Sequence, residues 1–297
     1  MTLCNRGARA VKFRLNRSPK DSTYALKEGN MKRTTSVRDI MDKKGKERIV
    51  MVTSYDATMT RILDASDVDI ILVGDSAGNV MAGMDNTLGI TMDQMIYHTQ
   101  CVTRVKPKAL VVGDMPFLSY QTSVEDAVRN AGRFLKEAGA QAVKLEGGLR
   151  VIEQVRAIVK ADIPVMGHLG LTPQSVHAFG GYKVQARGAE AAKLLMDNAL
   201  ALQDAGVFSM VLEGVPARVA GEVSRALEVP TIGIGAGIDC DGQVLVIQDL
   251  LGMDQTFKPK FVKQYANLFD IIKGAVDTYA SEVRSGTFPG EEHSYKD

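Results

Sequence analysis

The segment that decides the fold is residues 210–219, MVLEGVPARV, in which an apolar run leads to Glu213 and then to a Gly-Val-Pro turn. A short apolar run that stops at turn-forming residues is typical of a buried β-strand. A carboxylate at the end of such a strand either caps the next helix or belongs to a site. The rest of the chain indicates which interpretation holds.

Seven other segments repeat this pattern of a Val- and Ile-rich run. They are RIVMVTS (48–54), DIILVGD (69–75), ALVVGDM (109–115), QAVKLEG (141–147), IPVMGHL (163–169), PTIGIGA (230–236) and a weaker QVLVIQD (243–249). Helical spacing lies between them, most clearly at 91–105, 122–140, 189–206 and 215–228. Strands and helices that alternate every 30 to 40 residues, roughly, predict parallel pairing through right-handed crossovers. Eight units predict a (βα)8 TIM barrel with one domain, and a doubly wound sheet is the alternative.

Charged and polar residues at the strand ends favour the barrel. They are Asp75, Asp114, Lys144, Glu146, His168 and Glu213, from five different strands. In a parallel barrel all carboxyl ends of the strands open on one face, so these side chains are expected to meet at one mouth. The alternative for each residue alone is that it caps the following helix.

Composition excludes several classes of protein. The 297 residues carry a formal charge of +1 without long charged blocks, which argues against a nucleic-acid or membrane-binding surface. No run approaches the roughly 18 to 20 apolar residues of a membrane span. Three widely spaced cysteines argue against a disulfide framework and for a reducing compartment, so we expect a cytoplasmic protein that binds small molecules.

The first 30 residues differ from the rest. Residues 1–20 contain six basic residues and no acidic one, and they lack the apolar stretch of a secretory signal. We expect residues 1–30 to be a disordered leader or an upstream-start extension, with organelle targeting as the alternative. Met31 then begins the catalytic barrel, residues 31–297.

Three of the predicted carboxylates indicate a metal site. Asp75, Asp114 and Glu146 on neighbouring strands would repel each other in a partly desolvated pocket unless a cation lay among them. Oxygen ligands suit Mg²⁺, which keeps open positions for a chelating substrate. A 2-oxo acid offers that chelate, and a metal that polarises its carbonyl makes the proton on the adjacent carbon removable.

The other predicted residues surround this chelate. Lys144 would neutralise the substrate charge or, alternatively, pair with one of the acids. Ser76 would donate a hydrogen bond to the substrate carboxylate or cap a turn. Glu213, further round the barrel, is suited to accept the proton from carbon. His168 would orient the substrate or donate a proton, with a purely structural role as the alternative.

Several motifs together resemble a known family. VGDS (73–76), DMPF (114–117), VKLEGG (143–148), GHLGLTPQSV (167–176), FGGYKVQAR (179–187), LEGVP (212–216), IGIGAG (232–237) and FPGEEHS (288–294) are similar to the 3-methyl-2-oxobutanoate hydroxymethyltransferases, also called ketopantoate hydroxymethyltransferases. The resemblance runs from about Met31 to the C-terminus. GHLGLTPQSV with FGGYKVQ is its most specific part, whereas GIGAG does not fit the dinucleotide-binding spacing.

This resemblance implies a (βα)8 barrel of the phosphoenolpyruvate/pyruvate type, Mg²⁺, 5,10-methylenetetrahydrofolate as one-carbon donor, and a homodecamer. It implies transfer of a hydroxymethyl group to 3-methyl-2-oxobutanoate, which gives 2-dehydropantoate for coenzyme A biosynthesis. Position by position it assigns Mg²⁺ to Asp75, Asp114 and Glu146, the 2-oxo acid to Asp75, Ser76, Asp114, Lys144 and His168, and proton abstraction to Glu213. No motif marks the folate contacts.

Two other functions remain open at this point. A Mg²⁺-dependent carbon–carbon lyase or phosphonomutase that acts on small 2-oxo acids would use the same three carboxylates. A non-catalytic oligomeric paralogue would keep the strand pattern and lose the strand-end acids, all of which are present in this chain.

Overall fold

Eight parallel strands close into a barrel in the computed structural model of the chain, which describes residues 33–181, 183–255 and 259–297. Each strand pairs with the next, and β8 pairs with β1. The strands are β1 (Ile49–Thr53), β2 (Ile70–Val73), β3 (Leu110–Asp114), β4 (Ala142–Glu146), β5 (Val165–Gly170), β6 (Ser209–Glu213), β7 (Thr231–Ile234) and β8 (Gly242–Leu245). The predicted barrel is confirmed, and the doubly wound sheet is excluded.

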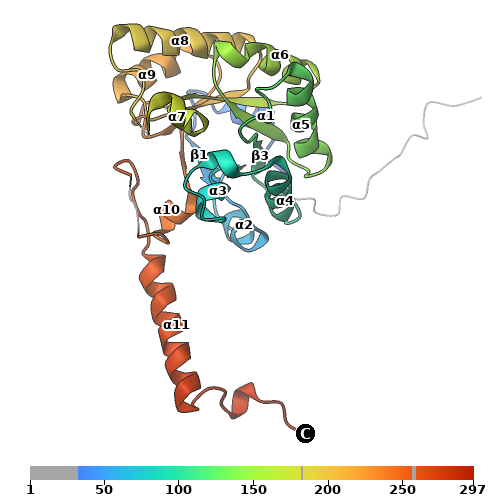
Figure 1. The fold of residues 1–297 in the computed structure, drawn as a ribbon, viewed down its shortest axis with the longest axis vertical. Coiled ribbons are helices and arrows are strands. Elements are labelled where there is room, and N and C mark those ends of the chain that lie inside the picture. Colours follow the sequence, from blue (N-terminus) through green and yellow to red (C-terminus); the bar gives the residue numbers. More distant parts are fainter. Residues whose placement is uncertain (1–32, 182, 256–258) are drawn as a thin grey trace, which may run out of the picture. The chain divides into compact units, whose positions relative to one another are not determined.

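The helices lie around the barrel, except that the last one extends away from it (Figure 1). They are α1 (Val37–Asp42), α2 (Ala57–Asp64), α3 (Ala77–Val80), α4 (Met92–Thr103), α5 (Val124–Lys136), α6 (Ile152–Lys160), α7 (Val176–Phe179), α8 (Ala189–Asp204), α9 (Ala217–Ala226), α10 (Ile247–Leu251) and α11 (Leu268–Ser285). Ser123 caps α5 by accepting from the Asp126 amide, and Gly139, with φ of +71°, lies just beyond the end of that helix. The described residues from Thr34 onward form one compact unit, and the predicted leader, residues 1–30, lies outside the described residues.

Alternation along each strand divides the core into two parts. Outward side chains such as Val143 and Leu145 pack with helix residues such as Phe134. Inward side chains form a separate apolar cluster inside the barrel, to which α1 adds the fully buried Ile40. On β4 the inward positions are Ala142, Lys144 and Glu146, so the apolar interior gives way to charged groups toward the carboxyl end of the strand.

Helix α11 differs from the others because none of its residues is buried. Its exposed apolar side chains are Phe269, Ile271, Ile272, Val276, Tyr279 and Val283. An amphipathic helix gains most of its stability by packing its apolar face, so this face is unusual in a compact domain. No helix within the described ranges has the length and hydrophobicity of a membrane span.

Candidate active site

The six predicted strand-end residues lie in one continuous series of contacts. Strand register places Asp114 beside Lys144, Glu146 beside His168, and Gly170 beside Glu213. The backbone amide of Asp75 reaches Asp114, and the side chains of Lys144 and His168 connect the remaining members. The structure therefore brings together all six residues, as the barrel predicts. We call them the carboxylate cluster: Asp75, Asp114, Lys144, Glu146, His168 and Glu213.

None of the four carboxylates in the cluster caps a helix. The N-cap of α3 is Ser76, that of α5 is Ser123 and that of α9 is Pro216, while α6 is preceded by a short 3₁₀ turn. The capping alternative for the strand-end acids is therefore wrong. Ser76 makes no side-chain cap bond; its Oγ lies 2.9 Å from the hydroxyl of the buried Tyr55. The pKa of Tyr55 is raised by burial, so the phenol stays protonated.

Asp114 and Lys144 form a buried ion pair. Lys144 Nζ lies 2.8 Å from Asp114 Oδ1, and Asp114 Oδ2 accepts from the Asp75 amide at 3.2 Å. Burial raises the pKa of Asp114, the Lys144 charge lowers it and Asp75 raises it, with a net value of about 7. Burial lowers the pKa of Lys144, but Asp114, Asp75 and Glu146 raise it above its ordinary value, so the ammonium stays charged.

His168 lies between two carboxylates. Nδ1 is 3.4 Å from Glu146 Oε1, and Nε2 is 3.3 Å from Glu213 Oε2. Nδ1 is also 3.3 Å from Lys144 Nζ, and one nitrogen cannot accept from Lys144 while it donates to Glu146. Burial and the Lys144 charge lower the pKa of His168, but the two carboxylates raise it to about 9. The imidazolium form therefore prevails, and Lys144 pairs with Asp114.

Glu213 is the most accessible acid of the cluster, with a side chain 16% exposed. The turn after β5 approaches it closely, because the Leu171 amide donates to the Glu213 carbonyl oxygen at 2.7 Å. Gly170 makes this approach possible: its φ is +93°, and a Cβ would lie 2.2 Å from that carbonyl oxygen. The glycine in HLGLT therefore helps to set the position of Glu213.

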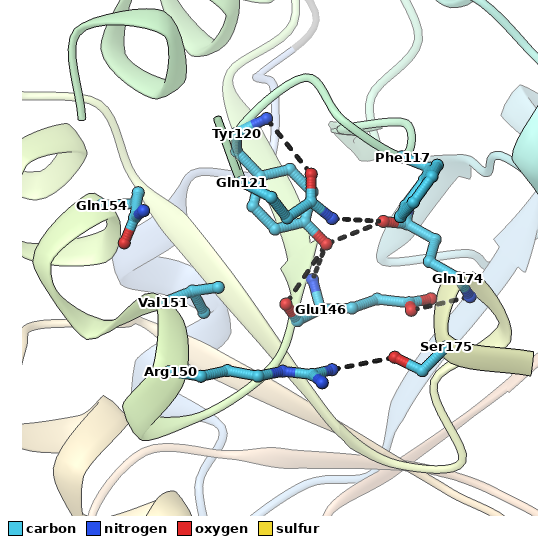
Figure 2. Close-up of a pocket in the computed structure, with 9 residues that line it drawn as sticks. All are labelled: Phe117, Tyr120, Gln121, Glu146, Arg150, Val151, Gln154, Gln174 and Ser175. Atoms are coloured by element: carbon cyan, nitrogen blue, oxygen red, sulfur yellow. Dashed lines mark hydrogen bonds between the residues drawn. The ribbon is translucent and has the colours of Figure 1, made fainter. Parts of the chain in front are cut away.

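Sequence reasoning missed two further residues, Gln174 and Tyr120 (Figure 2). The side-chain Nε2 of Gln174 donates to Asp75 Oδ2 at 2.9 Å, and the backbone amide of Gln174 donates to Glu146 Oε2 at 3.0 Å. The Tyr120 hydroxyl donates to Gln174 Oε1 at 2.7 Å and accepts from the Glu146 amide at 3.1 Å. Both lie in loops, where no periodicity marks an inward side chain. The only signal was that Gln174 falls within the specific motif GHLGLTPQSV.

A cavity of about 220 Å³ flanks these two residues. Its lining, drawn in Figure 2, mixes polar and apolar side chains and consists of Phe117, Tyr120, Gln121, Glu146, Arg150, Val151, Gln154, Gln174 and Ser175. Asp114, Lys144, His168 and Glu213 are not part of it. The cavity therefore lies beside the carboxylate cluster.

A family model described as ketopantoate hydroxymethyltransferase matches residues 34–291. The chain belongs to this family. A 3-methyl-2-oxobutanoate hydroxymethyltransferase from Pelobacter propionicus is 56% identical over 267 residues, which cover 90% of this chain and 99% of the relative. The predicted resemblance to the hydroxymethyltransferases is confirmed.

Two solved structures share the fold of this ketopantoate hydroxymethyltransferase family member. One is 2,3-dimethylmalate lyase, a member of the PEP mutase/isocitrate lyase superfamily, with a TM-score of 0.56, 15% identity, and coverage of 88% of this chain and 92% of that one. The other is phosphonopyruvate hydrolase in complex with oxalate and Mg²⁺, with a TM-score of 0.58, 10% identity, and coverage of 88% and 93%. Both likenesses show that this chain shares its barrel fold with these proteins.

The donors of this family member suit a hard divalent cation. Asp75, Asp114, Glu146 and Glu213, when ionised, outnumber Lys144 and protonated His168 by four charges to two. Asp114 Oδ1 and Glu146 Oε1 are buried, with Lys144 Nζ at 2.8 Å from the first and His168 Nδ1 at 3.4 Å from the second. Oxygen donors with two excess negative charges fit Mg²⁺. Within the described residues no three acidic, His or Cys side chains stand at ligand spacing, so the fit rests on the kind of donors and on their charge.

Proposed function

We propose that this chain transfers a hydroxymethyl group from 5,10-methylenetetrahydrofolate to 3-methyl-2-oxobutanoate, with Mg²⁺ as cofactor, to give 2-dehydropantoate and tetrahydrofolate. The observation that carries the proposal is the buried cluster of four carboxylates, one lysine and one histidine at the carboxyl end of the barrel. Membership of the family and the 56% identical relative of that name support the reaction.

Asp75, Asp114 and Glu146 would hold the cation. Mg²⁺, when bound, polarises the keto group of the substrate and stabilises the negative charge that develops on its oxygen. The excess negative charge of the cluster supports this assignment.

Lys144 and Ser76 would bind the substrate carboxylate. The Lys144 ammonium is held by Asp114 at 2.8 Å, so its charge occupies a defined place in the interior of the barrel. The Ser76 hydroxyl makes no helix-capping hydrogen bond, and Ser76 directly follows Asp75 in the chain. Together these groups would orient the 2-oxo acid with its C3 carbon toward β6.

Glu213 would take the proton from C3. Its carboxylate is the most accessible of the cluster, and His168 Nε2, 3.3 Å from Glu213 Oε2, would orient it and line the same pocket. The C3–H bond breaks, its electrons form the enolate, and C3 then attacks the methylene carbon of the opened folate. Water supplies the hydroxyl oxygen as the bond from methylene carbon to folate nitrogen breaks, so the atoms balance.

The same proposal includes a homo-oligomer in the cytoplasm, a decamer by family resemblance. The apolar face of α11, with no buried residue in the described structure, supports association with other subunits. The 2-oxo acid and the folate are the expected small-molecule partners. The balanced charge of +1 supports the expectation that neither nucleic acid nor membrane binds.

The test is product formation from 3-methyl-2-oxobutanoate, methylenetetrahydrofolate and Mg²⁺, with the donor or the metal omitted in parallel. Both omissions should prevent 2-dehydropantoate formation, and solvent deuterium exchange at C3 should persist without the folate. Cleavage of 2,3-dimethylmalate or oxaloacetate instead would favour a lyase, as the fold likeness suggests. Absence of both product and exchange would indicate a non-catalytic paralogue.

A further inference from the structure

Gln174 contacts two carboxylates that lie on strands that do not pair with each other. Asp75 follows β2 and Glu146 ends β4, with β3 between them. The Gln174 side chain donates to Asp75 Oδ2 at 2.9 Å, and its backbone amide donates to Glu146 Oε2 at 3.0 Å. One residue thus connects both acids directly, from the loop between β5 and α7.

The orientation of the Gln174 amide is determined by its partners. Nε2 has two acceptors, Asp75 Oδ2 and the Met115 carbonyl oxygen, each at 2.9 Å. Oε1 accepts from the Tyr120 hydroxyl at 2.7 Å and from Gln121 Nε2 at 3.3 Å. A reversed amide would set its oxygen against a carboxylate and a carbonyl, so only the observed orientation satisfies all four contacts.

Gln174 engages one oxygen of each carboxylate and leaves the other available. Glu146 Oε1, the oxygen that does not accept from the Gln174 backbone amide, is buried and lies 3.4 Å from His168 Nδ1. Gln174 itself is only 6% exposed, and Pro173 begins its 3₁₀ turn, so both the side chain and its loop are constrained. A carboxylate that hydrogen bonds already restrain loses less conformational entropy on binding a cation than a freely rotating one.

We propose that Gln174 is a positioning residue that restrains one oxygen of Asp75 and one of Glu146, which lowers the entropy that these carboxylates lose when they bind a divalent cation, and that Tyr120 fixes the direction of the Gln174 side-chain amide (Figure 2). This inference rests on the proposed function, of which the cation is part. Hydrogen-bonded groups behind metal ligands typically change metal affinity about 10- to 100-fold when removed.

The test is Mn²⁺ binding to the full chain without substrates, measured from the free-ion electron paramagnetic resonance signal. In Gln174→Met the side chain keeps its approximate volume, so the neighbouring cavity does not open onto the carboxylates. The side-chain amide and its bond to Asp75 are lost, while the backbone amide still donates to Glu146. The Kd for Mn²⁺ should rise about 10-fold or more. The matched control is Gln154→Met, because Gln154 lines the same cavity without belonging to the cluster; its Kd should stay within about twofold of the parent, far below the change expected behind a ligand.

A rise in Kd of less than about fivefold in Gln174→Met would overturn the inference, because it falls short of the usual effect behind a metal ligand. An equal rise in Gln154→Met would also overturn it, because the effect would then not be specific to Gln174. If circular dichroism shows that Gln174→Met does not fold, Tyr120→Phe decides by the same threshold, because it removes only the hydroxyl that fixes the amide. Failure of the unaltered chain to bind Mn²⁺ would count against the metal in the proposed function. Equal binding by parent and Gln174→Met would refute only the role of Gln174.

Discussion

Replacing Glu213 by glutamine is expected to stop proton removal while substrate and metal still bind. The amide has almost the same size, so packing at the end of β6 is preserved, but it cannot accept a proton from carbon. In the described part of the chain the Glu213 carboxylate has an ion-pair contact with His168 alone, and none with Asp75, Asp114 or Glu146. Loss of a positioned general base typically lowers the rate about 10²- to 10⁴-fold, or about 3 to 5 kcal/mol in activation free energy.

The assay is proton NMR of 3-methyl-2-oxobutanoate in deuterated buffer with Mg²⁺, which follows loss of the C3 proton without the folate. Calorimetry measures whether the 2-oxo acid still binds. Glu222→Gln is the control, because among the described residues this surface acid forms its ion pair with Arg218 alone, on the same helix. Exchange in Glu213→Gln within about tenfold of the parent, below the usual contribution of a general base, would refute the assignment and make His168 the next candidate.

Three further outcomes are expected. Because the folded-state pKa of Asp114 is raised from 3.8 to about 7, the metal-free protein should lose stability as pH rises through this range, and Mg²⁺ should raise the melting temperature more at pH 8 than at pH 6. Gly170→Ala should lower the free energy of unfolding, measured in urea, by about 1 to 3 kcal/mol or more, because the added Cβ would clash with the Glu213 carbonyl oxygen. The same clash should displace Glu213 and slow proton exchange at C3 of the substrate. Deletion of residues 268–297 should reduce the assembly measured by light scattering if α11 contributes to subunit contacts.

The barrel and its cluster could be predicted because both follow from alternation. Inward positions two residues apart place Lys144 and Glu146 on one side of β4, and closure brings the carboxyl ends of all strands to one mouth. The last predicted strand was too long: QVLVIQD becomes β8 up to Leu245, and Ile247 begins α10. Its apolar residues are compatible with either structure, and the Ile247 amide bonds to Thr53 Oγ1, a contact between segments far apart in sequence.

The remaining features depend on contacts that periodicity does not encode. Gln174 and Tyr120 reach the carboxylates from loops, and only the closed barrel brings those loops together. Sequence also gave no expectation for α11, whose apolar residues normally indicate a buried face, although none of them is buried here. The ionisation of His168 likewise depends on two acids from different strands at 3.3 and 3.4 Å.

The division of the barrel interior has a consequence for how its chemistry can vary. Ile70, Leu110 and Met166 fill the interior nearer the amino ends of the strands that lead to the carboxylate cluster. Substitution near the mouth therefore leaves this packing, and with it strand closure, largely intact. Such a scaffold can exchange one reaction for another through a few positions per strand, which agrees with a shared barrel in a lyase that is only 15% identical.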